Sequence, residues 1–113
     1  MMKKVEAYIR PSALDDVREA LVEAGVTGMS VVEVRGFGRQ KGHTELFRGS
    51  EYEHHFLPKV KVEIMLQEKD VQAAVEAIIS ASRTGSVGDG KIGISPLDDV
   101  IRIRTGESGL DGV

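Results

Sequence analysis

The residues of this 113-residue chain best suited to binding a ligand are lysines and arginines beside glycine-rich turns. The segment Gly88-Asp89-Gly90-Lys91 places bare backbone N–H groups next to a lysine, and the segment 36–42 (GFGRQKG) repeats that combination. Exposed N–H groups beside cations are what phosphate oxygens require. Arg102 and Arg104 add two guanidiniums that repel each other unless an anion or carboxylates lie between them. We therefore expect a local anion site, with a surface salt-bridge role as the alternative for the two arginines.

Neither glycine segment is a complete nucleotide-binding motif. In the segment 36–42 the third glycine comes one place late for the dinucleotide fingerprint, and no helix is expected to follow. The segment 88–91 lacks the Walker spacing and the Ser or Thr after the lysine. No trio of nucleophile, base and orienting residue is visible, so we expect no catalytic apparatus and no enzyme.

All three histidines and most of the aromatic residues fall in one stretch of the chain. His43, His54 and His55 match no zinc spacing and no cysteine assists them, so we interpret them as solvated loop residues. Four of the five aromatic residues lie in or at the edge of the same stretch, which is typical of a surface that docks onto partners. The alternative for Phe37 and Phe56 is that they anchor the base of the loop.

Length and composition indicate one domain spanning residues 1–113. Fifteen Lys and Arg against eighteen Asp and Glu give a net charge of −3, so no bulk positive field exists to attract nucleic acid or an anionic membrane. Cysteine is absent, which excludes disulfides and thiol nucleophiles and is compatible with the cytoplasm. No apolar run approaches the ~20 residues of a membrane helix, and no signal-peptide core is visible. We expect a soluble, unprocessed cytoplasmic protein.

The strands and helices that would position these residues are predicted from the two spacings at which apolar residues recur along the chain. A period of two, or a short β-branched run, predicts strands over 4–10, 29–35, 59–66 and 91–95, the first stopped by Pro11 and the last by Pro96. A helical period predicts one helix from a Ser12–Asp15 capping box to Gly25 and a second over about 71–84. Residues 100–104 alternate once more, and we expect the tail after them to be mobile.

This element order predicts an α+β fold, a ferredoxin-like βαββαβ sandwich. Both helices should cover one face of a four-stranded antiparallel sheet, with a long loop between the second and third strands. The expected core residues are Val5, Ala7, Ile9, Leu14, Val17, Leu21, Val60, Val62, Ile64, Val75, Ile78, Ile92 and Ile94. The second strand is apolar on both sides, which indicates partial cover by other subunits. A loop that long in so small a domain is expected to be functional.

Two segments, Phe47-Arg48-Gly49-Ser50-Glu51-Tyr52 and 84–92 (TGSVGDGKI), resemble the signature patterns of the PII nitrogen-regulatory proteins. GFGRQKGHTEL, FLPKVKVEI and VIRIRTGE extend the resemblance over nearly the whole chain. It implies a homotrimer of ferredoxin-like subunits in which ATP and ADP compete for three clefts between subunits. Residues 37–56 would then be the T-loop, 84–91 the B-loop, and 102–113 the C-terminal loop.

The resemblance also implies the binding residues. Those for nucleotide are Ser30, Gly36, Gly38, Arg39, Glu63, Gly88, Asp89, Gly90, Lys91, Arg102 and Arg104. Those for 2-oxoglutarate are Gly38, Arg39, Gln40, Lys41, Gly42 and Lys59. Gln40 would also be the protein ligand of a Mg²⁺ shared by the ATP phosphates and 2-oxoglutarate, oxygen donors that suit this hard cation. Tyr52 matches a tyrosine that is uridylylated or adenylylated in some members, and Ser50 a serine that is phosphorylated in others.

The function that the resemblance implies is a regulator that senses ATP, ADP and 2-oxoglutarate and reports through the T-loop. Expected partners are an ammonium transporter, nitrogen-assimilation enzymes or a modifying nucleotidylyltransferase, with the membrane reached only through the transporter. The sequence departs from the family at Phe47, at Gly93 and at 53–55 (EHH), which leaves the partner surface open. Alternatives are a PII-like regulator of carbon or metal homeostasis, an acylphosphatase-like enzyme, and an RNA-binding module, for which the sheet offers only Tyr8 as a stacking aromatic.

Overall fold

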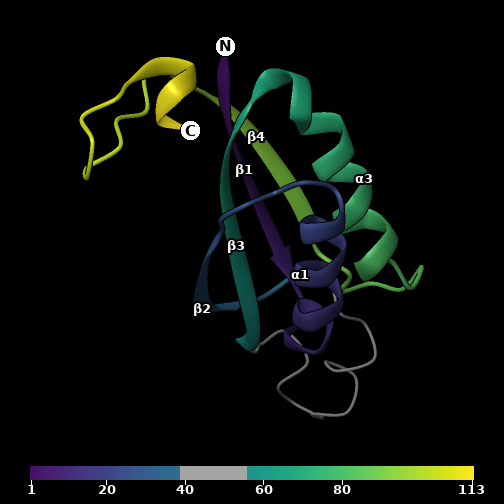
Figure 1. The fold of residues 1–113 in the computed structure, drawn as a ribbon. Helices are drawn as coiled ribbons and strands as arrows, with labels where there is room; N and C mark the ends of the chain where they lie inside the picture. The colour runs from purple at the N-terminus through teal and green to yellow at the C-terminus, as the bar shows by residue number, and fades with distance from the viewer. Residues whose placement is uncertain (39–55) are drawn as a thin grey trace, which may run out of the picture.

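The computed structural model describes residues 1–38 and 56–113 (Figure 1). Its elements are β1 (Met2–Ile9), η1 (Pro11–Ala13), α1 (Leu14–Glu23), β2 (Ser30–Gly36), β3 (Leu57–Gln67), η3 (Glu68–Asp70), α3 (Val71–Ser82), β4 (Lys91–Leu97) and η4 (Gly109–Gly112), where η marks a 3-10 helix. The strands form one antiparallel sheet in the order β2-β3-β1-β4. Figure 1 shows α1 and α3 together on one face of it. The ferredoxin-like prediction is confirmed.

The core lies between this face and the two helices. In a strand every second side chain points to the same face, so the two central strands each send one row inward. The helices pack against each other, and α3 also packs against β1. The buried apolar side chains of the cluster are Val5, Ala7, Ile9, Val17, Leu21, Val60, Val62, Ile64, Leu66, Ala74 and Ile78. Burying each large side chain contributes roughly 1.5–3 kcal/mol, which fixes the sheet on which the site is built.

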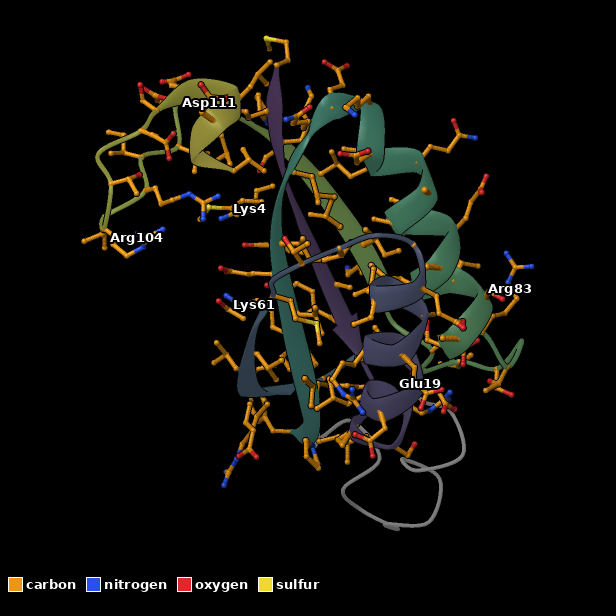
Figure 2. All side chains as sticks on the ribbon, in the orientation of Figure 1. Lys4, Glu19, Lys61, Arg83, Arg104 and Asp111 are labelled. Atoms are coloured by element: carbon orange, nitrogen blue, oxygen red, sulfur yellow. The ribbon has the colours of Figure 1, made fainter. Side chains whose placement is uncertain are left out.

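The opposite face of the sheet carries charge, and neither α1 nor α3 covers it. On β1 the Lys4 ammonium lies 3.0 Å from the Glu6 carboxylate, and on β3 Lys61 lies 3.1 Å from Glu63. The strand register places Glu6 directly opposite Glu63. Figure 2 shows Lys4 and Lys61 on the side of the sheet away from the helices. Val32, in register with Lys61, leaves 47% of its surface exposed on this face.

The strand and helix ends correct two predictions. No side-chain cap bond holds the start of α1, so the capping box predicted at Ser12 and Asp15 is wrong. A 3-10 turn leads into the helix instead, with the Ala13 N–H donating to the Arg10 carbonyl. Pro96 does not end the last strand but lies inside β4. Because β4 is an edge strand, one side of its backbone has no neighbouring strand to bond. A proline, which lacks an N–H, is tolerated there when its nitrogen faces that open side.

The edge position of β4 also corrects the predicted core. Ile94 is 52% exposed and Val75 is only half-buried. Both line an open groove of about 420 Å³ between α3 and β4, together with Ile79. Since no further strand follows β4, its inward-facing side chains have neighbours on one side only. Ile92 is the one of the two predicted β4 residues that packs against the core.

The C-terminal segment is folded, contrary to the expectation of a mobile tail. Ile101 forms a bridge with Ser108, so residues 100–104 are not a strand of the sheet but one side of a small hairpin. The Gly109 N–H donates to the Asp99 carboxylate over 2.9 Å, and Gly112 in η4 is buried. Figure 1 shows the hairpin projecting beside the N-terminus, at the opposite end of the sheet from the loop that joins α3 to β4.

Candidate functional site

A hollow of about 300 Å³ lies where β1 ends and β4 begins. The register of the sheet places Tyr8 between Lys61 on β3 and Lys91 on β4. The hollow is lined by Tyr8, Phe37, Gly38, Lys59, Val87, Gly88, Gly90 and Lys91. We call it the phosphate hollow. It brings together glycine-flanked amides and two lysines from three separate parts of the chain, as a polyphosphate or a carboxylate would need.

The loop 84–90 owes its shape to hydrogen bonds onto the Asp89 carboxylate. One carboxylate oxygen accepts the N–H groups of Thr84 and Gly85, over 2.7 and 2.8 Å, and the other accepts the Thr84 hydroxyl. These bonds, first of all those from Thr84, hold the pKa of Asp89 well below its ordinary value of 3.8. Asp89 therefore stays ionised and turns toward its own loop.

Two cations from outside the loop fasten it to the sheet. The Arg10 guanidinium donates to the Asp89 carboxylate, to Thr84 Oγ1 over 3.2 Å and to the Val87 carbonyl over 2.8 Å. Lys59 Nζ donates to the Gly88 carbonyl over 2.9 Å. Burial lowers the pKa of Lys59 below 10.5, the positive charge of Arg10 lowers it further, and Asp89 acts in the opposite direction. Among the described residues, these two side chains are the cations that donate to carbonyls of the loop.

A second hollow, of about 500 Å³, lies toward the opposite end of the sheet. We call it the distal hollow. Three predicted nucleotide residues, Ser30, Glu63 and Arg102, line it, and Ser30 is in register with Glu63. Arg102 donates to the Val113 carbonyl over 2.8 Å, which ties the end of the chain to this wall. The wall also contains Thr27, Gly28 and Met29, which the sequence did not single out.

The structure therefore divides the predicted nucleotide residues into two groups. Gly38, Gly88, Gly90 and Lys91 line the phosphate hollow, while the distal hollow holds the other group. Arg104 lies on the projecting hairpin (Figure 2), exposed and without a hydrogen bond or ion pair to residues 1–38 or 56–113. The alternation over residues 100–104 would put both arginines on one side of a strand, but they lie at a turn in which the Gly106 N–H donates to the Arg102 carbonyl.

Several predicted residues lie outside the described part of the chain. They are Arg39, Gln40, Lys41, Gly42, Ser50 and Tyr52. The described residues on either side of that segment meet at Phe37 and Phe56, whose rings stack edge to face with centroids 5.1 Å apart. This pair fits the interpretation in which both phenylalanines anchor the base of the loop. Gly36 precedes them as the last residue of β2.

Arg10 is the site residue that sequence reasoning missed. The alternating pattern predicts only that Arg10 is the polar last residue of a strand that Pro11 stops. Its partners Thr84 and Asp89 lie 74 and 79 residues further along the chain. Periodicity alone could not pair them.

Comparisons with known proteins find matches to both the sequence and the overall fold. The family model described as "Nitrogen regulatory protein P-II" matches residues 2–107. Proteins named nitrogen regulatory protein P-II from Cereibacter sphaeroides and Rhodobacter capsulatus are 65% and 62% identical over 112 residues, covering 99% of this chain and all of theirs. Among solved structures, B. subtilis GlnK superimposes with a TM-score of 0.83 at 38% identity, covering 99% of this chain and 98% of that chain.

A second solved structure is that of Arabidopsis thaliana PII bound to citrate. It superimposes with a TM-score of 0.81 at 39% identity and covers 99% of this chain and 92% of that chain. Separately, none of the helices in the described ranges is long and apolar enough to cross a membrane.

Proposed function

Because the chain belongs to the nitrogen regulatory protein P-II family, a family of regulators and not of enzymes, we propose that it senses adenine nucleotides and 2-oxoglutarate and controls partner proteins through residues 37–56. ATP and ADP would compete for one site, with their phosphates on the amides of Gly88 and Gly90 and on Lys91. The nucleotide bound at that site would shift residues 37–56 between conformations of different partner affinity. The size of this shift in population is limited by the difference in the nucleotide's affinity for the two conformations.

The observation that carries this proposal is the division of the nucleotide residues between two hollows. One subunit cannot surround a nucleotide with both groups, because they lie toward opposite ends of its sheet. In a homotrimer the phosphate hollow of one subunit would face the distal hollow of the next, and Arg104 would reach the phosphates from the projecting hairpin. An exposed guanidinium that makes no hydrogen bond or ion pair to the described residues of its own subunit fits that role.

Exposed apolar side chains on the sheet support the homotrimer. Val31 and Val32 on opposite sides of β2 are 42% and 47% exposed, and Met65 on β3 is 50% exposed. Val32 and Met65 lie on the charged face of the sheet and Val31 on the helix side, so this apolar surface favours partial cover of both sides of β2 by other subunits. Subunits that meet there would enclose three nucleotide sites.

The base of the loop would bind 2-oxoglutarate. Lys59 already binds a carbonyl oxygen, so a carboxylate of the effector would replace Gly88 as its partner. Gly38, Arg39, Gln40, Lys41 and Gly42 would complete this second site, and Gln40 would hold a Mg²⁺ that neutralises phosphate charge. The citrate bound by the Arabidopsis relative is also a polycarboxylate, which supports a carboxylate-binding role.

Calorimetry together with light scattering tests the proposal. By light scattering the wild-type protein should have the mass of a trimer. By calorimetry it should bind Mg-ATP and ADP competitively, and it should bind 2-oxoglutarate only when Mg-ATP is present. Arg104→Ala should weaken ATP binding roughly tenfold or more, the loss expected for a charge-assisted contact. Arg18→Ala, which removes an exposed cation from the helix side, is the matched control and should bind as the wild type does. A monomer, or a protein indifferent to both nucleotides, would contradict the proposal.

The partners would be an ammonium transporter and nitrogen-assimilation enzymes, met in the cytoplasm, with Tyr52 or Ser50 open to a modifying enzyme. A pull-down from native lysate with ATP, ADP, or ATP plus 2-oxoglutarate identifies them. Capture of nitrogen-assimilation proteins that changes with the effector supports this function. Capture of carbon- or metal-homeostasis proteins would instead support a regulator of those pathways.

A further inference from the structure

We propose that Arg10 is a positioning residue that holds the loop 84–90 in its phosphate-binding shape through a clasp with Asp89. The clasp consists of the Arg10 guanidinium, the Asp89 carboxylate, the Thr84 hydroxyl and the Val87 carbonyl. Its role in binding rests on the nucleotide function proposed above. Arg10 does not itself need to touch the ligand.

The backbone around Arg10 is well anchored. It follows the last residue of β1, a central strand, and precedes Pro11, which begins a 3-10 turn. Its carbonyl accepts the Ala13 N–H, and its extended backbone continues the strand direction toward the loop. The planar guanidinium fork is pre-organised, so less side-chain freedom is lost for each hydrogen bond that it forms, and the anchored backbone fixes the point from which the side chain reaches the loop.

The contacts of Arg10 reach both ends of the loop. Thr84 is its first residue and Asp89 is next to its last, while Val87 lies between them. Asp89 in turn gathers the N–H groups of Thr84 and Gly85. One side chain thus closes the loop into a ring and ties it to β1. An isolated exposed ion pair would contribute little, but a pair with several shared hydrogen bonds in a fixed geometry contributes more.

The clasp also governs the charge that a phosphate would meet. Asp89 is flanked by Gly88 and Gly90, which both line the phosphate hollow. An anion at that position repels phosphate unless its charge is compensated and its oxygens are occupied. Arg10 supplies the compensating charge, two loop N–H groups occupy one carboxylate oxygen, and the Thr84 hydroxyl occupies the other. Loss of Arg10 would therefore both loosen the amides and leave an uncompensated carboxylate beside the ligand.

Hydrogen exchange on the ligand-free full chain, combined with calorimetry of Mg-ATP, tests the clasp. In Arg10→Ala the Thr84 and Gly85 amides should exchange at least about tenfold faster than in the wild type, while amides of the central strands keep their protection. ATP affinity should fall roughly tenfold or more. Arg10→Lys keeps the charge but not the forked geometry, so it should restore part of the affinity.

Arg83→Ala is the matched control, because Arg83 is an exposed cation just before the loop whose side chain makes no hydrogen bond or ion pair to the described residues. It should leave both measurements unchanged. Wild-type protein that binds ATP while Arg10→Ala binds it equally well, or exchanges the two amides at the wild-type rate, would overturn the clasp alone. Wild-type protein that binds no ATP would refute the proposed function, and with it the role of the clasp in binding.

Discussion

Gly90 lies directly against the backbone of Tyr8: a Cβ built on this glycine would come within 1.7 Å of the Tyr8 carbonyl oxygen. Its φ of +106° is also one that L side chains rarely adopt. Only glycine allows the loop to come this close to the end of β1. The contact places the amides of the loop beside Lys59 and Lys91 in the phosphate hollow.

Gly90→Ala should therefore disrupt the loop. We expect a loss of about 2–4 kcal/mol in the free energy of unfolding, from backbone strain and from the clash with a main-chain atom that cannot move aside. Gly93→Ala is the control, since a Cβ there meets nothing within 4 Å and its φ is not positive. Urea denaturation at one protein concentration measures both variants. Equal stability of the two would contradict the close approach.

The core prediction compares two neighbouring residues of α1. Leu21 is 1% exposed and Val22 is 61% exposed. Leu21→Ala should lower the free energy of unfolding by about 3 kcal/mol, because it removes buried methyl groups and leaves a cavity. Val22→Ala should change it by no more than about 0.5 kcal/mol. The same denaturation experiment decides, and similar losses in both variants would show that the helix face is assigned wrongly.

The Asp89 carboxylate should remain ionised in acid. Hydrogen bonds from Thr84, then from Gly85, and the ion pair with Arg10 place its pKa in the folded state below 3.8. The folded pKa is thus lower than the unfolded one, so this carboxylate stabilises the fold fully above the unfolded pKa and loses that effect as the pH falls through the folded pKa. A carbon-detected NMR titration of the Asp89 carboxyl should give a midpoint below 3.8. A midpoint at or above that value would mean that the bonds do not persist in solution.

Lys59 should titrate below 10.5, chiefly because burial disfavours its charge. Between the folded and the unfolded pKa the unfolded chain binds more protons, so the contribution of Lys59 to stability rises with pH just below 10.5. Arg10→Ala removes a neighbouring positive charge and should raise the pKa of Lys59 toward its ordinary value. NMR titration of the lysine Cε signal measures this shift. A lower pKa in the variant would contradict the coupling between the two cations.

Local hydrophobic patterns in the sequence predict the strands and helices and their order along the chain. The alternation of Val5, Ala7 and Ile9 with polar residues, and the helical spacing of Val71, Ala74 and Ile78, are properties of near neighbours, and the structure contains these elements at those places. Prediction failed where an element's place in the sheet mattered. Pro96 lies inside the strand that it was expected to end, and Ile94 is exposed instead of buried. Both differences arise because β4 is an edge strand, a position that the local hydrophobic pattern does not reveal.

Tertiary structure alone decided how the site is put together. It brought Arg10 onto Asp89 across 79 residues of chain and separated Lys91 from Arg102, although these two are only eleven positions apart. The reason is geometric. A period fixes which way a side chain faces, but which faces and strand ends meet depends on how the elements pack, and that is set by the free energy of the whole core.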